Sequence, residues 1–170
     1  MFEELSLHIL DIAMNSLSAG ASSVGIVVAE NLRRDRLMIR IRDNGRGMDE
    51  ATLRTVLGRS VSTKAGRRKP IGLGLALLRQ TTEMCDGAFQ VESEPGRGTQ
   101  VSATMRHSHV DRPPLGDLAA TIRTLCVAGG DVDVQLHYRA NGERFHFRSR
   151  ELKTADQPEM RQQTREAAVA

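Results

Sequence analysis

The chain is poor in the residues that proteins commonly use to bind nucleic acids. Its 170 residues include no tryptophan, one tyrosine and four phenylalanines, and its net charge is only +3. Single-stranded nucleic acid is usually held by aromatic side chains that stack on the bases, within a strongly basic surface. We therefore expect no nucleic-acid partner for this chain.

The sequence also lacks the signals of secretion and of membrane insertion. No apolar run approaches the roughly 18 residues that a membrane span needs. The acidic start Met1–Glu4 differs from the basic start of a secretory signal. Cys85 and Cys126 have no metal-type spacing, and we expect two reduced thiols rather than a disulfide. These absences predict a cytoplasmic protein without a membrane segment.

The hydrophobic pattern predicts an α/β chain in which helices and strands are interspersed. Pro113-Pro114 interrupts the pattern, and Asn141-Gly142 between two alternating segments predicts a hairpin. We expect a first unit at residues 1–106, a helix and hairpin at 107–150, and a polar tail at 151–170. The predicted helices span 2–18, 49–57, 73–85 and 115–127, and the predicted strands span 23–29, 36–42, 88–92, 99–105, 133–138 and 143–148.

Polar side chains interrupt the otherwise apolar first helix at the spacing of one helix face. His8, Asp11, Asn15 and Ser18 follow one another at helical spacing along this segment. One interpretation is a narrow edge that faces solvent. The other is a site for a metal ion and phosphate, because Mg²⁺ prefers hard oxygen ligands such as these.

Two glycine-rich segments suit a ligand that approaches the backbone closely. Asp43–Gly47 follows a predicted strand, so the carboxylate of Asp43 stands at a strand end beside a turn. Gly72–Leu75 opens a predicted helix, where free backbone amides and the helix dipole attract anions. Taken singly, the first segment is also an ordinary turn and the second also suits close packing.

In combination and in this order, these segments resemble the four ATP-binding boxes of the gyrase, heat-shock chaperone, histidine kinase and MutL superfamily. The resemblance covers residues 5–105 and is closest to the histidine-kinase branch. It implies a two-layer α/β sandwich of the Bergerat type, with a mixed sheet, three helices on one face and ATP between the helices and a lid. The C-terminal helix and hairpin would be added to this fold. The matching segments are Asp11–Asn15, Asp43–Gly47, Gly72–Leu75 and Gly96–Thr99.

The resemblance implies a role for each matching residue around the nucleotide. Asn15 would hold Mg²⁺ against the triphosphate, and Asp43 would bind the amino group of adenine. Gly45 and Gly47 would admit the base, and Thr99 would join the hydrogen bonds around it. ATP and Mg²⁺ are therefore the expected ligands.

A lid is expected between the second and third boxes, at residues 58–70. Its clustered basic side chains are either solvated or face phosphate, and the resemblance favours the second interpretation. Lys64 is the candidate phosphate contact within it. Gly72 and Gly74 would hinge the lid and present backbone amides to phosphate, together with Leu75.

The chain departs from the family pattern at two places. Asp11 stands where the family usually has glutamate, so its implied role as catalytic base stays open. Val56–Arg59 replaces the phenylalanine-rich box that usually precedes the lid. Because fewer than ten residues precede the first box, we also expect no helical hairpin with a phosphoacceptor histidine in front of it.

Two classes of function fit these expectations. One is a regulatory kinase that phosphorylates a protein partner in trans, and the other is a binding module that ATP switches without phosphoryl transfer. Residues 106–150 are expected either to form a surface for a partner or a homodimer, or to pack against the ATP-binding unit. The segment around His109 resembles a phosphoacceptor box, but its expected place in a loop after a strand favours a structural role.

Overall fold

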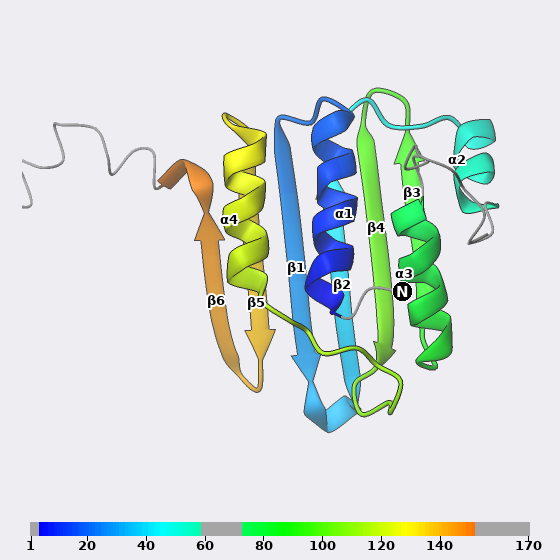
Figure 1. The fold of residues 1–170 in the computed structure, drawn as a ribbon, viewed down its shortest axis with the longest axis vertical. Helices are drawn as coiled ribbons and strands as arrows, with labels where there is room; N and C mark the ends of the chain where they lie inside the picture. Colours follow the sequence, from blue (N-terminus) through cyan, green and yellow to red (C-terminus); the bar gives the residue numbers. More distant parts are fainter. Residues whose placement is uncertain (1–3, 59–72, 152–170) are drawn as a thin grey trace, which may run out of the picture.

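The sheet of this protein has helices on only one of its two faces (Figure 1). The computed structural model describes residues 4–58 and 73–151. These residues form a six-stranded sheet in the order β3-β4-β2-β1-β5-β6. A short 3₁₀ helix, η1 (Leu32–Arg34), joins the first two strands. The strands are β1 Ser23–Asn31, β2 Arg36–Asp43, β3 Ala88–Glu94, β4 Gly98–Arg106, β5 Asp133–Ala140 and β6 Glu143–Arg148.

The helices form the second layer of the structure. Strands β1 and β5 run parallel, whereas the other neighbouring strands run antiparallel, so the sheet is mixed. The predicted two-layer α/β sandwich is therefore confirmed. None of the described helices is both long and apolar enough to cross a membrane. These helices are α1 Leu5–Ser18, α2 Glu50–Leu57, α3 Leu73–Met84 and α4 Leu118–Gly129.

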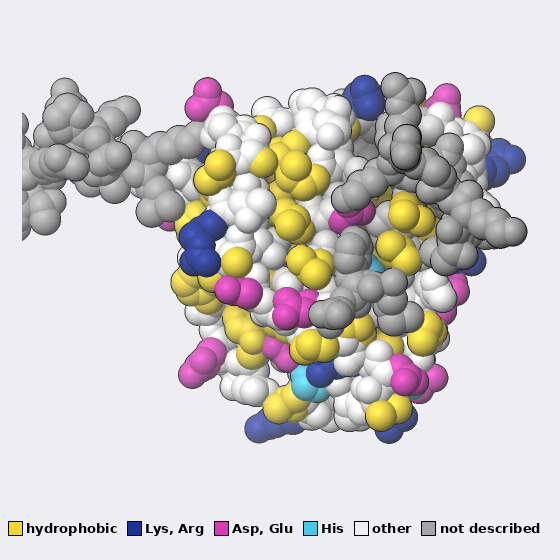
Figure 2. Space-filling view, viewed as in Figure 1, with side chains coloured by type: hydrophobic (Ala, Val, Ile, Leu, Met, Phe, Trp, Pro, Cys, Tyr) yellow, Lys and Arg dark blue, Asp and Glu magenta, His cyan; other side chains and the backbone are white. Residues whose placement is uncertain are grey.

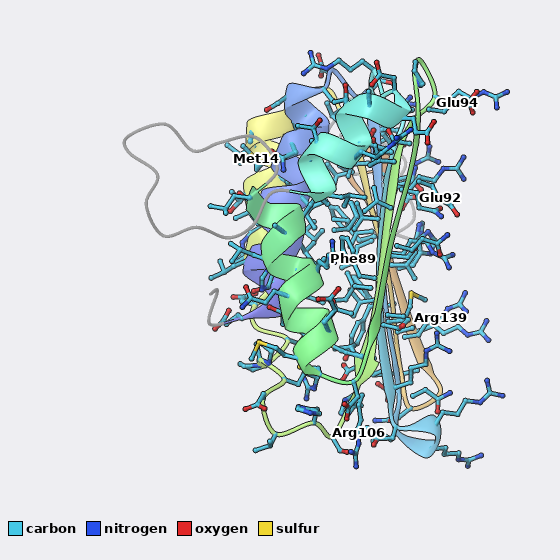
Figure 3. The ribbon with its side chains drawn as sticks, turned by 90° about the vertical axis from the view of Figure 1, so that its right-hand side faces the viewer. Met14, Phe89, Glu92, Glu94, Arg106 and Arg139 are labelled. Carbon is cyan, nitrogen blue, oxygen red and sulfur yellow. The ribbon has the colours of Figure 1, made fainter. Side chains whose placement is uncertain are left out.

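The core lies between the two layers, and strict alternation along the strands explains why. In β2, Leu37, Ile39 and Ile41 are almost fully buried under the helices, while Arg40 and Arg42 between them are exposed. Such alternation is typical of a sheet with one covered face and one open face. The side view in Figure 3 shows the packed side chains between sheet and helices and the longer polar ones on the opposite side.

Helix α4 begins at Leu118 rather than at residue 115, where the hydrophobic pattern placed its start. Asp117 is the N-cap, and its side chain accepts a hydrogen bond from the backbone N–H of Ala120 at 2.8 Å. Aspartate is among the preferred N-cap residues because it satisfies a free amide of the first turn. The carbonyl of Leu115 is used elsewhere, as the acceptor for the backbone N–H of Ser6 at 2.8 Å.

The C-terminal elements extend the same two layers. Strand β5 pairs along its whole length with residues 23–30 of β1, and α4 packs on α1. The hydroxyl of Tyr138 donates to Glu30 across this junction at 2.6 Å, and this hydrogen bond raises the pKa of Tyr138 to about 12. The same hydrophobic core includes Ile122 and Leu125 of α4 and Val134 and Leu136 of β5.

Burial of Leu125 generates a prediction about stability. This side chain is 1% exposed, so Leu125→Ala leaves a cavity between α4 and the sheet. We expect the free energy of unfolding to fall by about 2–5 kcal/mol, measured by urea denaturation. Val127→Ala on the same helix is the matched control, because Val127 is 85% exposed. An equal loss in both variants would contradict the assignment of α4 to the core.

Helix α1 carries a histidine in the interior of the protein. The side chain of His8 is fully buried, and its Nε2 lies 3.4 Å from the hydroxyl of Thr81 on α3. Burial disfavours the charged imidazolium, and it lowers the pKa of His8 from 6.5 to about 4. The imidazole is therefore neutral at neutral pH, and it belongs to the contact between α1 and α3 rather than to a solvent-facing edge.

This lowered pKa predicts a pH dependence of folding. Between pH 6.5 and pH 4 the unfolded chain binds a proton at His8 that the folded chain does not bind. Above pH 6.5 the neutral state of His8 costs the folded protein no stability. As the pH falls toward 4, the free energy of unfolding decreases because of this group by up to about 3 kcal/mol. Urea unfolding from pH 7 to pH 4 should show a smaller loss for His8→Gln than for the parent chain. Equal slopes in the two proteins would contradict the assignment.

Candidate functional site

A cavity of about 480 Å³ opens between the helix layer and one end of the sheet. This volume lies in the range of pockets that hold small organic ligands. Its walls are mostly apolar, and a few polar side chains converge on it. Lining residues come from α1 (Ile12, Asn15, Ser16, Ala19), β2 (Ile41, Asp43), the turn and helix that follow (Arg46, Gly47, Met48, Asp49, Thr52, Val56), α3 (Leu75) and the β3–β4 region (Pro95, Thr99, Val101).

Asp43 is the most constrained polar residue of this cavity. It is 8% exposed, and its Oδ1 accepts the backbone N–H groups of Gly45 at 2.9 Å and Thr99 at 3.2 Å. Its Oδ2 accepts the hydroxyl of Ser16 at 2.6 Å. A carboxylate has about four acceptor positions, so one position on Oδ2 remains for a donor in the cavity.

Two glycine turns interlock beside Asp43. Gly47 has a φ of +65°, and a Cβ there would lie 2.0 Å from the carbonyl oxygen of Glu94 in the other turn. Gly98 has a φ of +93°, and a Cβ there would lie 2.1 Å from the backbone oxygen of Asp43. Any larger residue at either position would therefore push the turns apart, because its Cβ would clash with backbone atoms. Residues other than glycine also rarely adopt these positive φ values.

Ser93 ties the same two turns together through its side chain. Its hydroxyl oxygen accepts the backbone N–H of Met48 at 2.8 Å and lies 2.8 Å from the hydroxyl of Thr99. The backbone N–H of Gly96 also donates to the carbonyl of Arg46 at 2.8 Å. These bonds hold the end of β2 and the start of β4 in one fixed arrangement around the cavity.

Close packing also joins α1 to the start of α3. A Cβ on Gly74 would lie 1.9 Å from Oδ2 of Asp11, so only glycine lets the first turn of α3 approach this carboxylate. The N-terminus of a helix is the end that favours negative charge. Asp11 is half-buried, and it does not line the cavity, whereas Asn15, one turn further along α1, does.

The structure brings most of the predicted site residues into one region. Asn15, Asp43, Gly47, Leu75 and Thr99 all line the cavity. These residues come from four separate segments of the chain, so their convergence could not arise from local sequence alone.

The other predicted residues lie behind the cavity or outside the described residues. Gly45 is buried, and a Cβ there would lie 3.0 Å from the Cβ of Ala19 at the end of α1. Gly74 faces Asp11, as described above. Lys64, Gly72 and the predicted lid beyond Gly58 lie outside the residues that the structure describes.

Two residues of the site were missed in the sequence analysis. Ser16 directly follows Asn15 and is 3% exposed, so a small polar residue on a mostly apolar helix was the available signal. Ser93 precedes the turn at 94–98, and nothing in the sequence indicates that its hydroxyl reaches the other turn. Both residues act on Asp43 or on the turns that carry it.

His109 lies far from this cavity. The cavity is at the end of the sheet where β4 begins, and His109 follows the opposite end of that strand. A strand as long as β4 spans about 27 Å. The Nδ1 atom of His109 accepts a hydrogen bond from the backbone N–H of Asp111 at 3.2 Å, so the side chain of His109 is held within its own turn.

Comparisons with known proteins identify similar chains among sensor kinases. A probable C4-dicarboxylate sensor kinase of Halalkalibacterium halodurans is 36% identical over 94 residues, which are 52% of this chain and 17% of the relative. Sporulation kinase D of Bacillus subtilis is 29% identical over 97 residues, or 57% and 19%. Sensor histidine kinase DcuS of Escherichia coli is 36% identical over 88 residues, or 51% and 16%. This chain therefore spans less than a fifth of the length of these relatives.

A solved structure and a family model also match this chain. The N-terminal domain of a DNA repair protein has a similar structure, with a TM-score of 0.57 at 14% identity, over 85% of this chain and 52% of that one. At this identity the likeness shows the fold alone. The model of the family described as histidine kinase-, DNA gyrase B-, and HSP90-like ATPase matches residues 1–109. Because that match covers more than half of the sequence, the chain belongs to this family of ATPases.

Proposed function

We propose that this chain binds Mg-ATP in the cavity at Asp43 and transfers a phosphoryl group to a protein partner. The observation that supports nucleotide binding most directly is the remaining acceptor position on the Asp43 carboxylate. The exocyclic amine of adenine is a donor that suits it, and the apolar side chains Ile12, Met48 and Val56 suit the faces of a base. A cytoplasmic location, where ATP is available, is part of the proposal.

The phosphates would lie toward α1 and the start of α3. Asn15 lines the cavity on α1, and the amides of the first turn of α3 offer an anion site. Gly74 adds no side chain of its own to this turn, and the carboxylate of Asp11 packs against it. In this proposal Gly72 hinges the lid and Lys64 contacts the phosphates from it.

Mg²⁺ fits this set of residues as a shared ligand of ATP and protein. Among the described residues no group of three or more His, Cys, Asp or Glu side chains could hold a metal ion alone. Mg²⁺ bound with a nucleotide needs no such cage, because phosphate oxygens and waters fill most of its octahedral shell. The carboxamide oxygen of Asn15 would supply the protein ligand, and the ion would neutralise phosphate charge.

Asp11 is the proposed catalytic base. Its carboxylate lies one helical turn before Asn15, at the start of α3, where the phosphates are proposed to approach. A carboxylate there can accept the proton of an attacking hydroxyl as the new phosphate ester bond forms and ADP leaves. Its side chain is one methylene shorter than the glutamate that is usual in the family.

The alternative is a binding module in which ATP switches a partner surface without phosphoryl transfer. The position of Asp11 outside the cavity lining favours it, because a base must reach the reacting group. In this function the same nucleotide contacts would form, and only the chemistry would be absent.

Asp43→Asn tests the adenine contact. The carboxamide oxygen can still accept the amides of Gly45 and Thr99, but its NH₂ group would face the adenine amine as a second donor. We expect ATP affinity to fall roughly tenfold or more by calorimetry, and the preference for ATP over GTP to narrow.

Asn15→Ala tests the proposed Mg²⁺ contact. This variant should lose only the part of the ATP affinity that depends on Mg²⁺, measured with and without a chelator.

Asp35→Asn, at the opposite end of the sheet, is the control for these measurements. Thermal unfolding of each variant separates a lost contact from a lost fold. Unchanged ATP affinity in a folded Asp43→Asn variant would refute the proposed adenine site.

Incubation with γ-phosphate-labelled ATP, alone and in lysate, tests phosphoryl transfer. The kinase proposal expects label on a second protein and its loss in Asp11→Asn, with ATP affinity retained within about twofold. His109→Gln should label the same target as the parent chain. ATP binding without any transferred label would support the switched binding module instead.

A further inference from the structure

The open face of the sheet carries several arginines that form no ion pair with the described residues. Figure 3 shows Arg139 on the side of the sheet away from the helices and Arg106 at the end of the sheet where β4 ends. Arg106 is paired with Asp35 and Arg148 with Asp133. Within the described parts of the chain, a further set of exposed arginines on this face forms no ion pair: Arg36, Arg40 and Arg42 of β2, Arg139 of β5 and Arg144 of β6.

The helix-covered face differs in charge. In Figure 2 the Lys and Arg side chains that are coloured lie mainly around the margin of that face, while hydrophobic side chains gather near its middle. The arginines of the open face are therefore a local concentration of charge. A guanidinium stays charged at any physiological pH, so this field is permanent.

The strand register places the basic side chains on both sides of β1. Val27 of β1 is paired with Arg40 of β2 and with His137 of β5. Neighbouring strands lie about 4.8 Å apart, so the flanking columns stand about 10 Å apart. We call this arrangement the β1 trough: its floor is Gly25, Val27 and Ala29, and its flanks are Arg42, Arg40 and Met38 on β2 and Gln135, His137 and Arg139 on β5.

Gly25 in the floor is not required by packing within the chain. A Cβ at this position would meet only the backbone oxygen of Arg42, at the ordinary contact distance of 3.9 Å. Glycine in the middle of a strand weakens the strand, and it often marks a place where another chain approaches closely. The floor of the β1 trough is therefore low beside Arg42 on one flank and Gln135 on the other.

We propose that the β1 trough docks an acidic segment of a partner protein. Arginine binds carboxylates through two parallel hydrogen bonds, and flanks about 10 Å apart suit one extended segment or one helix of about 10–12 Å diameter. Residues 152–170 of this chain carry no acidic excess to match the β1 trough, because their side-chain charges balance: Asp156, Glu159 and Glu166 against Lys153, Arg161 and Arg165.

Two observations favour an acidic protein over a nucleic acid. The aromatic residues of the hairpin, Tyr138, Phe145 and Phe147, line the cavity under α4 on the helix side, so they cannot stack bases over the open face. Glu92 and Glu94 on β3 point from the same open face (Figure 3). Their charge would repel a long polyanion that ran across the whole sheet, but not a short segment along β1.

Fluorescence anisotropy without nucleotide tests the proposal. The probe is a labelled oligoglutamate peptide about as long as β1, with oligoglutamine as the neutral reference. We expect binding that weakens with salt, and a loss of about tenfold or more in each of two variants, Arg40→Glu/Arg42→Glu and Arg139→Glu/Arg144→Glu. Arg79→Glu/Arg123→Glu, on the helix face, changes the net charge equally and should lose little.

A further variant places a side chain in the floor of the β1 trough without changing its charge. Gly25→Val should weaken peptide binding severalfold while thermal unfolding shows no loss of stability. Oligoglutamate binding no stronger than oligoglutamine, a loss from one flank only, or an equal loss in the helix-face control would overturn the proposal. Tighter binding of a DNA duplex or of anionic vesicles, abolished by the same flank variants, would assign the face to that other ligand.

Discussion

The carboxylate of Asp43 is the point on which the arrangement of the site depends. It accepts hydrogen bonds from Ser16 on α1, from Gly45 in the following turn and from Thr99 on β4. These donors belong to segments that are far apart along the chain and must all be in place at once. Because a buried carboxylate without such donors is costly, the same bonds that position Asp43 also fix α1 and the two glycine turns relative to the sheet.

Because helices cover only one face of the sheet, its two faces differ in what they carry. The helix-covered face holds the core, the buried His8 and the cavity at Asp43, whereas the open face has no core to build and carries arginines. Alternation along each strand makes this division automatic, because neighbouring residues point to opposite faces. Ile41 lines the cavity while Arg40 and Arg42 beside it face solvent, so a nucleotide site and a docking surface can share one strand.

The C-terminal residues extend the family fold at the edge of its sheet and do not form a detached unit. The family match ends at residue 109, yet β5 pairs with β1 along the full strand and α4 packs beside α1. Without β5, the strand β1 would be an exposed edge with unpaired backbone groups. Residues 107–150 therefore cover both the edge of the sheet and the side of α1, and they leave β6 as the outer strand.

The sequence by itself determined the elements, because alternation and helical periodicity are local patterns. The resemblance of its four boxes to the ATPase family added the sandwich and five of the cavity residues: Asn15, Asp43, Gly47, Leu75 and Thr99. The sequence could not decide the start of α4, since a hydrophobic pattern does not show that Asp117 caps the helix or that Leu115 bonds to Ser6. It also could not show Ser93 bridging two turns, or Asp11 facing Gly74 rather than the cavity. Only the tertiary structure decided these features, because each depends on a contact between segments whose distance the local sequence does not encode.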